Sequence, residues 1–155
     1  MARSSGRATT SGRTEPVWGV GDGYKPAGFD GPPKTGVCVV GAGIAGLTTA
    51  YLLAEAGIQV VIVDEKPIGG GETGRTSAHL ASAVDDRFSN LERMHGAEAT
   101  ALHHQSHAAA IDLIERIVVE ERIGCDFARV DGFLFPGDGA PAARLDEELA
   151  AARRA

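Results

Sequence analysis

Apolar and polar positions first form a regular pattern between residues 37 and 64. A short β-branched run, Val37 to Val40, is followed by an apolar helical pattern that continues to Gly57. A second β-branched run, Ile58 to Asp64, ends on an acid. Short runs of this kind predict buried strands, and apolar spacing of three to four residues predicts a helix. The pattern therefore predicts a strand, a helix and a second, parallel strand.

The turn between the first strand and the helix is rich in glycine. It reads Gly41-Ala42-Gly43-Ile44-Ala45-Gly46, the spacing of a dinucleotide-binding turn. Gly41 allows a tight turn, Gly43 allows a pyrophosphate to approach the backbone, and Gly46 allows the helix to lie close to the strand. The N–H groups of the first helical turn would face the phosphates.

Asp64 lies 18 residues beyond Gly46, near the usual spacing of the acid that binds a ribose diol. Its charge would repel a 2′-phosphate, which argues against NADP. Such a glycine turn alone is a weak signal, and an ordinary glycine-rich turn is the alternative. Strand, turn, helix, second strand and acid occur here in the expected order, so we predict a dinucleotide site.

The segment that follows Asp64 is dense in glycine and in hydrogen-bond donors. Glycines let backbone run close to a ligand, and a guanidinium can complement a phosphate charge. A flexible surface loop is the alternative, but the position directly after the acid favours ligand binding. The candidate donors are Thr73, Arg75, Thr76 and Ser77.

Two helices and a hairpin are predicted farther along. Ser89-Asn90-Leu91-Glu92 matches a capping box for a short helix that ends at Gly96. A long helix is predicted over Ala97 to Arg122. Asp131-Gly132, between apolar runs, predicts a hairpin. The segment from Arg144 to Arg153 has helical composition.

Composition narrows the function classes. The chain has 155 residues, 43% hydrophobic and 23% charged, with a net charge of −6, which gives no indication of a nucleic-acid partner. Two cysteines form no disulfide framework and fit a reduced, cytoplasmic compartment; Cys38 is expected to be a small buried hydrophobe. No apolar run is long enough to span a bilayer.

Three histidines of the long helix, His103, His104 and His107, suggest a metal site. His103 and His107 are four residues apart, but no acid or cysteine accompanies them at a suitable spacing. We therefore predict no metal and interpret them as the polar edge of an amphipathic helix. His79, in the glycine-rich loop, could touch the cofactor or carry a covalent link to it.

The predicted fold class is α/β, with an incomplete Rossmann-like βαβ unit. Only two strands suit parallel pairing, whereas a doubly wound sheet needs more. We predict a mobile lead-in over residues 1–34, a partial nucleotide-binding domain over 35–124, and the start of an antiparallel sheet over 125–155. These features suggest the N-terminal part of a longer protein.

The sequence resembles a known family in residues 35 to 155. GAGIAGLTTAYLLAEAGIQVVIVDE, IGGGETGRTSAHL, SHAAAIDLIERIV and CDFARVDGFLF are similar to FAD-dependent oxidoreductases of the glycine oxidase and D-amino-acid oxidase type. The triple-glycine loop resembles the γ-glutamylputrescine-oxidase-like subgroup, some members of which carry a C-terminal Rieske iron–sulfur domain.

The resemblance implies FAD as cofactor and oxidation of a C–N bond in an amine or amino acid, with a hydride equivalent passing to flavin N5. It places the FAD pyrophosphate at the glycine turn, the adenosine ribose at Asp64, and the loop from Gly71 to Ser77 beside the flavin. Many members have Glu at the ribose position, so Glu65 is the alternative acid. The segment from residue 125 would begin a substrate domain, and no catalytic residue is identified.

Two alternatives remain at this stage. One is an NAD-binding dehydrogenase domain, and the other is a truncated, non-catalytic product that binds a nucleotide. The extended loop after Asp64 and the early hairpin argue against the first. The isolated chain is expected neither to retain FAD nor to turn over substrate, because uncovered apolar faces favour aggregation.

Overall fold

A computed structural model describes residues 28, 34–83, 85–137 and 143–155. The predicted lead-in over residues 1–34 lies almost wholly outside the described residues. Contacts divide the chain into two units, residues 1–79 and 80–155, which are described separately below. The predicted boundary between residues 124 and 125 therefore stays a prediction.

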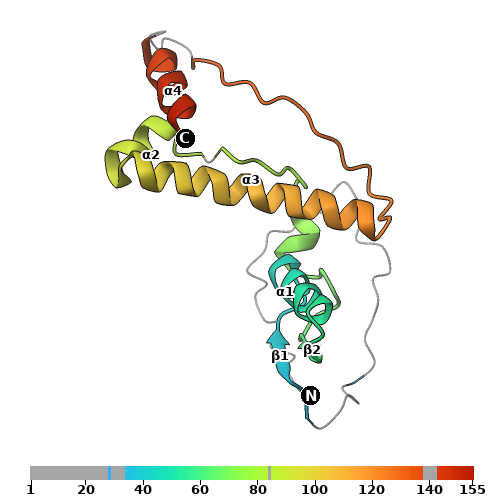
Figure 1. Cartoon of the computed structure of the whole chain (residues 1–155). Coiled ribbons are helices and arrows are strands. Elements are labelled where there is room, and N and C mark those ends of the chain that lie inside the picture. Colours follow the sequence, from blue (N-terminus) through green and yellow to red (C-terminus); the bar gives the residue numbers. More distant parts are fainter. Residues whose placement is uncertain (1–27, 29–33, 84, 138–142) are drawn as a thin grey trace, which may run out of the picture. The chain divides into compact units, whose positions relative to one another are not determined.

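The first unit is a βαβ unit followed by a short 3-10 helix (Figure 1). Its strands pair in parallel, with Val37 opposite Val60 and Val40 opposite Val63. The predicted strand–helix–strand order is confirmed, and the described part of the chain contains an α/β arrangement with a two-stranded sheet. The elements are β1 (Val37–Val40), α1 (Ile44–Glu55), β2 (Val60–Val63) and η1 (Glu72–Arg75).

The helix α1 ends earlier than its apolar pattern suggested. Gly57 adopts a left-handed backbone with φ of 76°, and the N–H of Ile58 donates to the carbonyl of Leu53 at 2.9 Å. A left-handed glycine after the last turn is a common helix stop, because glycine has no Cβ to oppose it. The chain can then turn back into β2 within a few residues.

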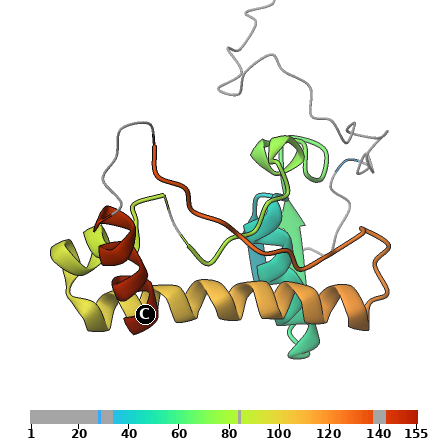
Figure 2. The same cartoon turned by 90° about the horizontal axis from the view of Figure 1, so that it is seen from above.

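In its described residues, the second unit contains three helices, α2 (Phe88–His95), α3 (Ala97–Glu120) and α4 (Ala143–Arg154). The long helix predicted over Ala97 to Arg122 is confirmed to within two residues and is roughly 36 Å long. Phe88 meets the ring of His104 edge-on at 5.5 Å, which joins α2 to α3. Figures 1 and 2 show the extended chain after α3 returning toward α4.

The predicted hairpin around Asp131-Gly132 is wrong, because residues 125–135 form no strand. A hairpin of two strands alone is only marginally stable in water, and among the described residues no other strand lies beside this segment to stabilise it. The segment is instead extended and exposed: Val130, Phe133 and Phe135 are 75–79% accessible. Arg129 ties it to α3 by ion pairs with Asp112 and Glu115, each at 2.6 Å.

The predicted capping box is also wrong, although Gly96 does end α2. Ser89 is the second residue of the helix, and its hydroxyl donates to the buried carboxylate of Glu148 at 2.7 Å. That carboxylate also accepts the N–H groups of Phe88 and Ser89, at 2.7 and 3.0 Å. A side chain from α4 therefore does the capping that the local pattern assigned to Ser89.

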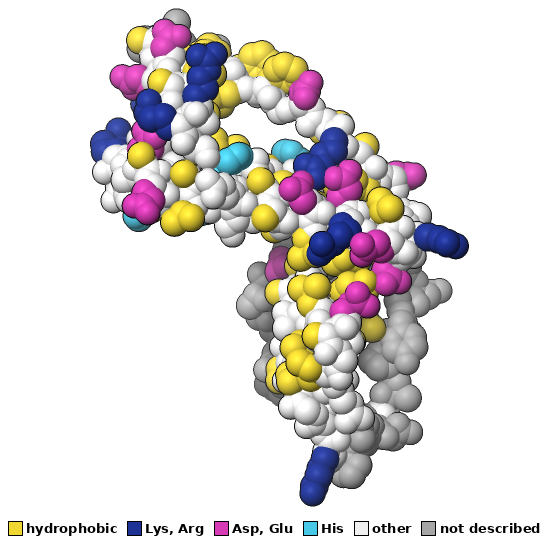
Figure 3. Space-filling view, viewed as in Figure 1, with side chains coloured by type: hydrophobic (Ala, Val, Ile, Leu, Met, Phe, Trp, Pro, Cys, Tyr) yellow, Lys and Arg dark blue, Asp and Glu magenta, His cyan; other side chains and the backbone are white. Residues whose placement is uncertain are grey.

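Cys38 is exposed, contrary to the expectation that it is buried. Residues alternate along β1, so one face of the strand turns away from α1, and Val40 on that face is 83% accessible. A sheet of two strands with a helix on one side leaves such positions uncovered. Figure 3 shows hydrophobic side chains reaching the surface in both units.

Candidate dinucleotide-binding site

The glycine turn joins β1 to α1 through a conformation that other residues would oppose. Gly41 has φ of +110°, and its N–H donates to the carbonyl of Val63 at 2.8 Å. A Cβ on Gly46 would lie 1.9 Å from the carbonyl oxygen of Gly41 and 3.3 Å from the side chain of Val39. The predicted close contact between helix and strand at Gly46 is therefore confirmed.

Asp64 is bound to the same turn. One carboxylate oxygen accepts the N–H of Ala42 at 2.6 Å, and the other accepts the N–H of Lys66 at 2.7 Å. These hydrogen bonds, that of Ala42 first, hold the pKa of Asp64 below its ordinary value. The carboxylate therefore remains ionised at neutral pH, and each oxygen keeps a lone pair that can accept from a ribose hydroxyl.

Thr73, on η1, reaches the start of α1. Its hydroxyl oxygen accepts the N–H of Ile44 at 2.9 Å, and a Cβ on Gly43 would lie 3.1 Å from that same oxygen. The absence of a side chain at Gly43 thus makes room for Thr73 as well as for a ligand. Sequence reasoning named Thr73 as a donor but missed this contact, for which no local pattern gives a signal.

The first turn of α1 has N–H groups available to an anion. The N–H groups of Ala45 and Gly46 have no acceptor in the part of the chain that the structure describes. No acidic side chain occupies the first turn. Unpaired N–H groups at the positive end of a helix dipole attract phosphate oxygens. The residues present therefore fit the pyrophosphate of a dinucleotide.

The remaining candidates lie on the segment that follows β2. The N–H of Gly69 donates to the carbonyl of Ala42 at 2.9 Å, which holds the start of this segment against the glycine turn. Gly71 precedes η1, and the hydroxyl of Thr76 accepts the N–H of Ala78 at 2.8 Å. Glu65, Arg75 and Ser77 are exposed. Ser77 makes no hydrogen bond to another described residue.

The structure therefore brings part of the candidate set together. The turn Gly41–Gly46, Asp64 and Thr73 form one connected arrangement through side-chain hydrogen bonds to the backbone. Glu65 directly follows Asp64, and Arg75, Thr76 and Ser77 lie at the end of η1 or just after it, all at exposed positions. The first group has the geometry that argues for a ligand, and the second group rests on its place in the sequence.

The three histidines of α3 lie on partly buried positions. The ring centroids of His103 and His107 are 4.3 Å apart. The ring nitrogens Nε2 of His103 and Nδ1 of His104 are buried, and neither has a hydrogen-bond partner among the residues that the structure describes. Across the described ranges, no group of three or more His, Cys, Asp or Glu is placed to hold a metal ion. No helix of those ranges combines the length and apolarity needed to cross a membrane.

Comparisons with known proteins agree with a flavin-binding unit. Residues 36–155 match the family model described as FAD dependent oxidoreductase (DAO). The chain is 32% identical over 99 residues to the "Putative Rieske 2Fe-2S iron-sulfur protein YhfW" of Bacillus subtilis (strain 168), covering 64% of this chain and 19% of that protein. It is 30% identical over 112 residues to the γ-glutamylputrescine oxidoreductase of Escherichia coli (strain K12), covering 72% and 26%.

A further match is shorter and has a higher identity. The D-amino acid dehydrogenase of Dechloromonas aromatica (strain RCB) is 54% identical over 37 residues, 24% of this chain and 9% of that protein. No solved structure gives a significant match. The chain spans about a fifth to a quarter of the length of the first two relatives. Because the family match covers all but the first 35 residues, the chain belongs to the FAD-dependent oxidoreductase (DAO) family, whose cofactor is FAD.

Proposed function

We propose that this chain provides the Rossmann-like, FAD-binding part of an enzyme that oxidises a C–N bond of an amine or amino acid. The observation that carries the proposal is the connection of Asp64 to the glycine turn through Ala42. It occurs within the residues that match the FAD-dependent family. Two relatives have names that refer to γ-glutamylputrescine and to D-amino acids, which supports an amine or amino acid as substrate.

In this proposal the chain's own groups bind and orient the cofactor. The N–H groups of Ala45 and Gly46 donate to pyrophosphate oxygens, and Asp64 accepts from the adenosine ribose. The hydroxyl of Thr73 accepts from Ile44, so its own proton can be donated to a phosphate oxygen. The exposed cation of Arg75 offsets the phosphate charge.

When bound, FAD would supply the redox chemistry, as the acceptor of a hydride equivalent from the carbon next to the substrate nitrogen. The oxidised product is an imine, which water hydrolyses. No residue described above contacts the substrate, so we assign no catalytic residue. The contribution of this chain is to hold the cofactor at one end and to fix its direction.

A C-terminal Rieske domain in the whole protein forms a further part of the proposal. Its support is the name of the Bacillus subtilis relative, of which this chain matches 19%. Reading the coding DNA past the codon for Ala155 tests it directly. An open frame with paired Cys and His ligands would support a Rieske domain, and a frame without them would contradict it.

The test of the proposed function is the cofactor and reaction of the whole protein. We expect a yellow protein with about one FAD per chain. In the absence of oxygen, an amine or amino acid should reduce the flavin, and hydrolysis of the imine product should release ammonia. The control is the same protein with a substrate that lacks the nitrogen. Purified protein that binds NAD and no flavin would contradict the proposal.

A further inference from the structure

We propose that a pocket between α2 and α4, in the second unit, binds a phosphate group. The pocket has a volume of about 190 Å³, several times the roughly 30 Å³ that a water molecule occupies in the liquid, so an oxyanion with four oxygens fits. We call it the arginine pocket. Its lining residues are Arg87, Ser89, Asn90, Arg93, Arg144 and Glu147.

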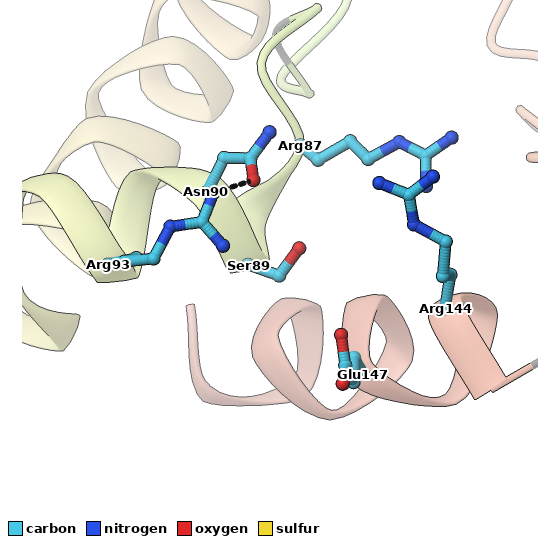
Figure 4. Close-up of a pocket in the computed structure, with 6 residues that line it drawn as sticks. All are labelled: Arg87, Ser89, Asn90, Arg93, Arg144 and Glu147. Carbon is cyan, nitrogen blue, oxygen red and sulfur yellow. Dashed lines mark hydrogen bonds between the residues drawn. The ribbon is translucent and has the colours of Figure 1, made fainter.

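Three arginines enter this pocket from two helices. Arg87 directly precedes α2, Arg93 is on α2, and Arg144 is in the first turn of α4. Figure 4 shows the side chains of Arg87 and Arg144 extending toward each other from the two helices. Arg93 donates to the side-chain oxygen of Asn90 at 2.5 Å, which fixes its position and leaves the amide N–H₂ of Asn90 able to donate.

The charge of the lining is strongly positive. Three guanidinium groups face one carboxylate, that of Glu147, so the lining carries a formal excess of two positive charges. Glu148 lies close to Arg87, but its oxygens already accept hydrogen bonds from Phe88 and Ser89. The N-terminus of α2 is therefore satisfied by Glu148, and the positive charge of the pocket comes from side chains.

The pocket arginines differ from others in the same unit. Arg129 and Arg154 each have a carboxylate at 2.6 Å. None of the three pocket arginines makes an ion pair with another residue that the structure describes. Two guanidinium groups that extend toward each other repel, and an anion between them removes that repulsion.

The chemistry of the pocket selects a phosphate group among anions. A guanidinium presents paired N–H donors that match two oxygens of one phosphate, and arginine is the preferred residue for such recognition. The doubly charged form of a phosphate neutralises the excess of two positive charges. Inorganic phosphate and a small phosphomonoester share this chemistry and are the two sources to be distinguished.

The test is calorimetric titration of the whole protein at low ionic strength, with excess FAD so that the N-terminus of α1 is occupied. The titrants are inorganic phosphate, phenyl phosphate and glutarate. We expect saturable binding of at least one phosphate titrant and weaker binding of glutarate. Binding of inorganic phosphate alone identifies the free ion, and preference for phenyl phosphate identifies an ester.

Substitutions locate the binding. Arg144→Gln is expected to weaken phosphate binding at least about tenfold, because a charge-assisted contact is lost. Arg153→Gln, on the same helix but outside the pocket, is the matched control and should leave binding unchanged. Circular dichroism confirms that both variants keep their helices. Absent phosphate binding, equal binding by Arg144→Gln, or tighter binding of glutarate would overturn the proposal.

Discussion

At the scale of single residues, Asp64 is both a ligand candidate and part of the local structure. It closes the glycine turn through Ala42 and its own strand end through Lys66. The spacing from Gly46 was enough to single it out, because the ribose acid follows from a local pattern. The sequence left Glu65 as the alternative ribose acid, since neighbouring acids share nearly the same spacing. The structure adds the hydrogen bond that Asp64 accepts from Ala42.

Asp64→Ala in the whole protein should weaken FAD binding by roughly 10- to 100-fold. The variant loses a hydrogen bond between a charged group and the ribose, which contributes about 1.5–3 kcal/mol. Fluorescence titration of the apoprotein with FAD measures the effect. Glu65→Ala is the matched control and should bind FAD normally. If Glu65→Ala were the damaging change, Glu65 would be the ribose acid.

The low pKa of Asp64 sets the pH range over which its carboxylate contributes to stability and to FAD affinity. Hydrogen bonds from Ala42 and Lys66 lower the pKa in the folded state relative to the unfolded chain. The stabilisation from Asp64 is therefore fully present above the unfolded pKa and is lost as pH falls through the lower, folded pKa. FAD affinity should not change through titration of Asp64 between about pH 5 and 8 and should fall below about pH 4. A midpoint near pH 6 that disappears in Asp64→Asn would contradict this.

The absence of a side chain at Gly46 allows α1 to lie close to the glycine turn. Gly46→Ala should lower the free energy of unfolding by about 3 kcal/mol, because its Cβ would lie 1.9 Å from the backbone oxygen of Gly41 and the backbone must move. Urea denaturation measures the change. Gly124→Ala is the control, since its Cβ would meet no atom within 4 Å, and it should change stability by less than about 0.5 kcal/mol.

At the scale of elements, helices with strong local signals were predicted well and their ends less well. The signals that predict α3 are local: the apolar spacing lies within the helix, and Gly96 directly precedes its first residue. The start of α2 depends instead on Glu148, which is 60 residues from Phe88. A short-range pattern contains no information on that acceptor, so the capping box was assigned to the wrong residue.

Glu148→Ala should destabilise the protein by about 1–3 kcal/mol, because the N–H groups at the start of α2 lose a buried, charged acceptor. Thermal unfolding measures it, with Glu147→Ala, an exposed neighbour, as the near-neutral control. Burial is the largest effect on the pKa of Glu148 and raises it, but the bonds from Ser89 and Phe88 together lower it overall. The difference between wild type and variant should therefore disappear only in acid, below about pH 4.5. An equal loss in Glu147→Ala would contradict this.

At the scale of the whole molecule, few of the described side chains are fully buried. The buried hydrophobic residues are alanines, whereas Val40, Val130 and Phe133 are each more than three-quarters accessible. Large exposed apolar areas are typical of interfaces that another part of a protein covers. The first two relatives are about four to five times longer than the region of them that this chain matches.

The 155 residues expressed alone should therefore associate and retain no FAD, whereas the whole protein should be soluble and yellow. Size-exclusion chromatography with absorbance at the flavin band compares the two. A mild detergent should reduce association of the short chain if exposed apolar area is the cause. A soluble, monomeric and yellow short chain would show that these residues suffice for the site.

The amino-acid sequence by itself determined the βαβ unit, the glycine turn and the acid after β2. Each depends on spacings within a few tens of residues that periodicity and turn chemistry express directly. Only the tertiary structure decided which residues close the site and cap the helices. The contacts of Thr73 with Ile44 and of Glu148 with Phe88 join residues 29 and 60 positions apart. Such contacts depend on how elements pack, and local patterns along the chain do not record packing.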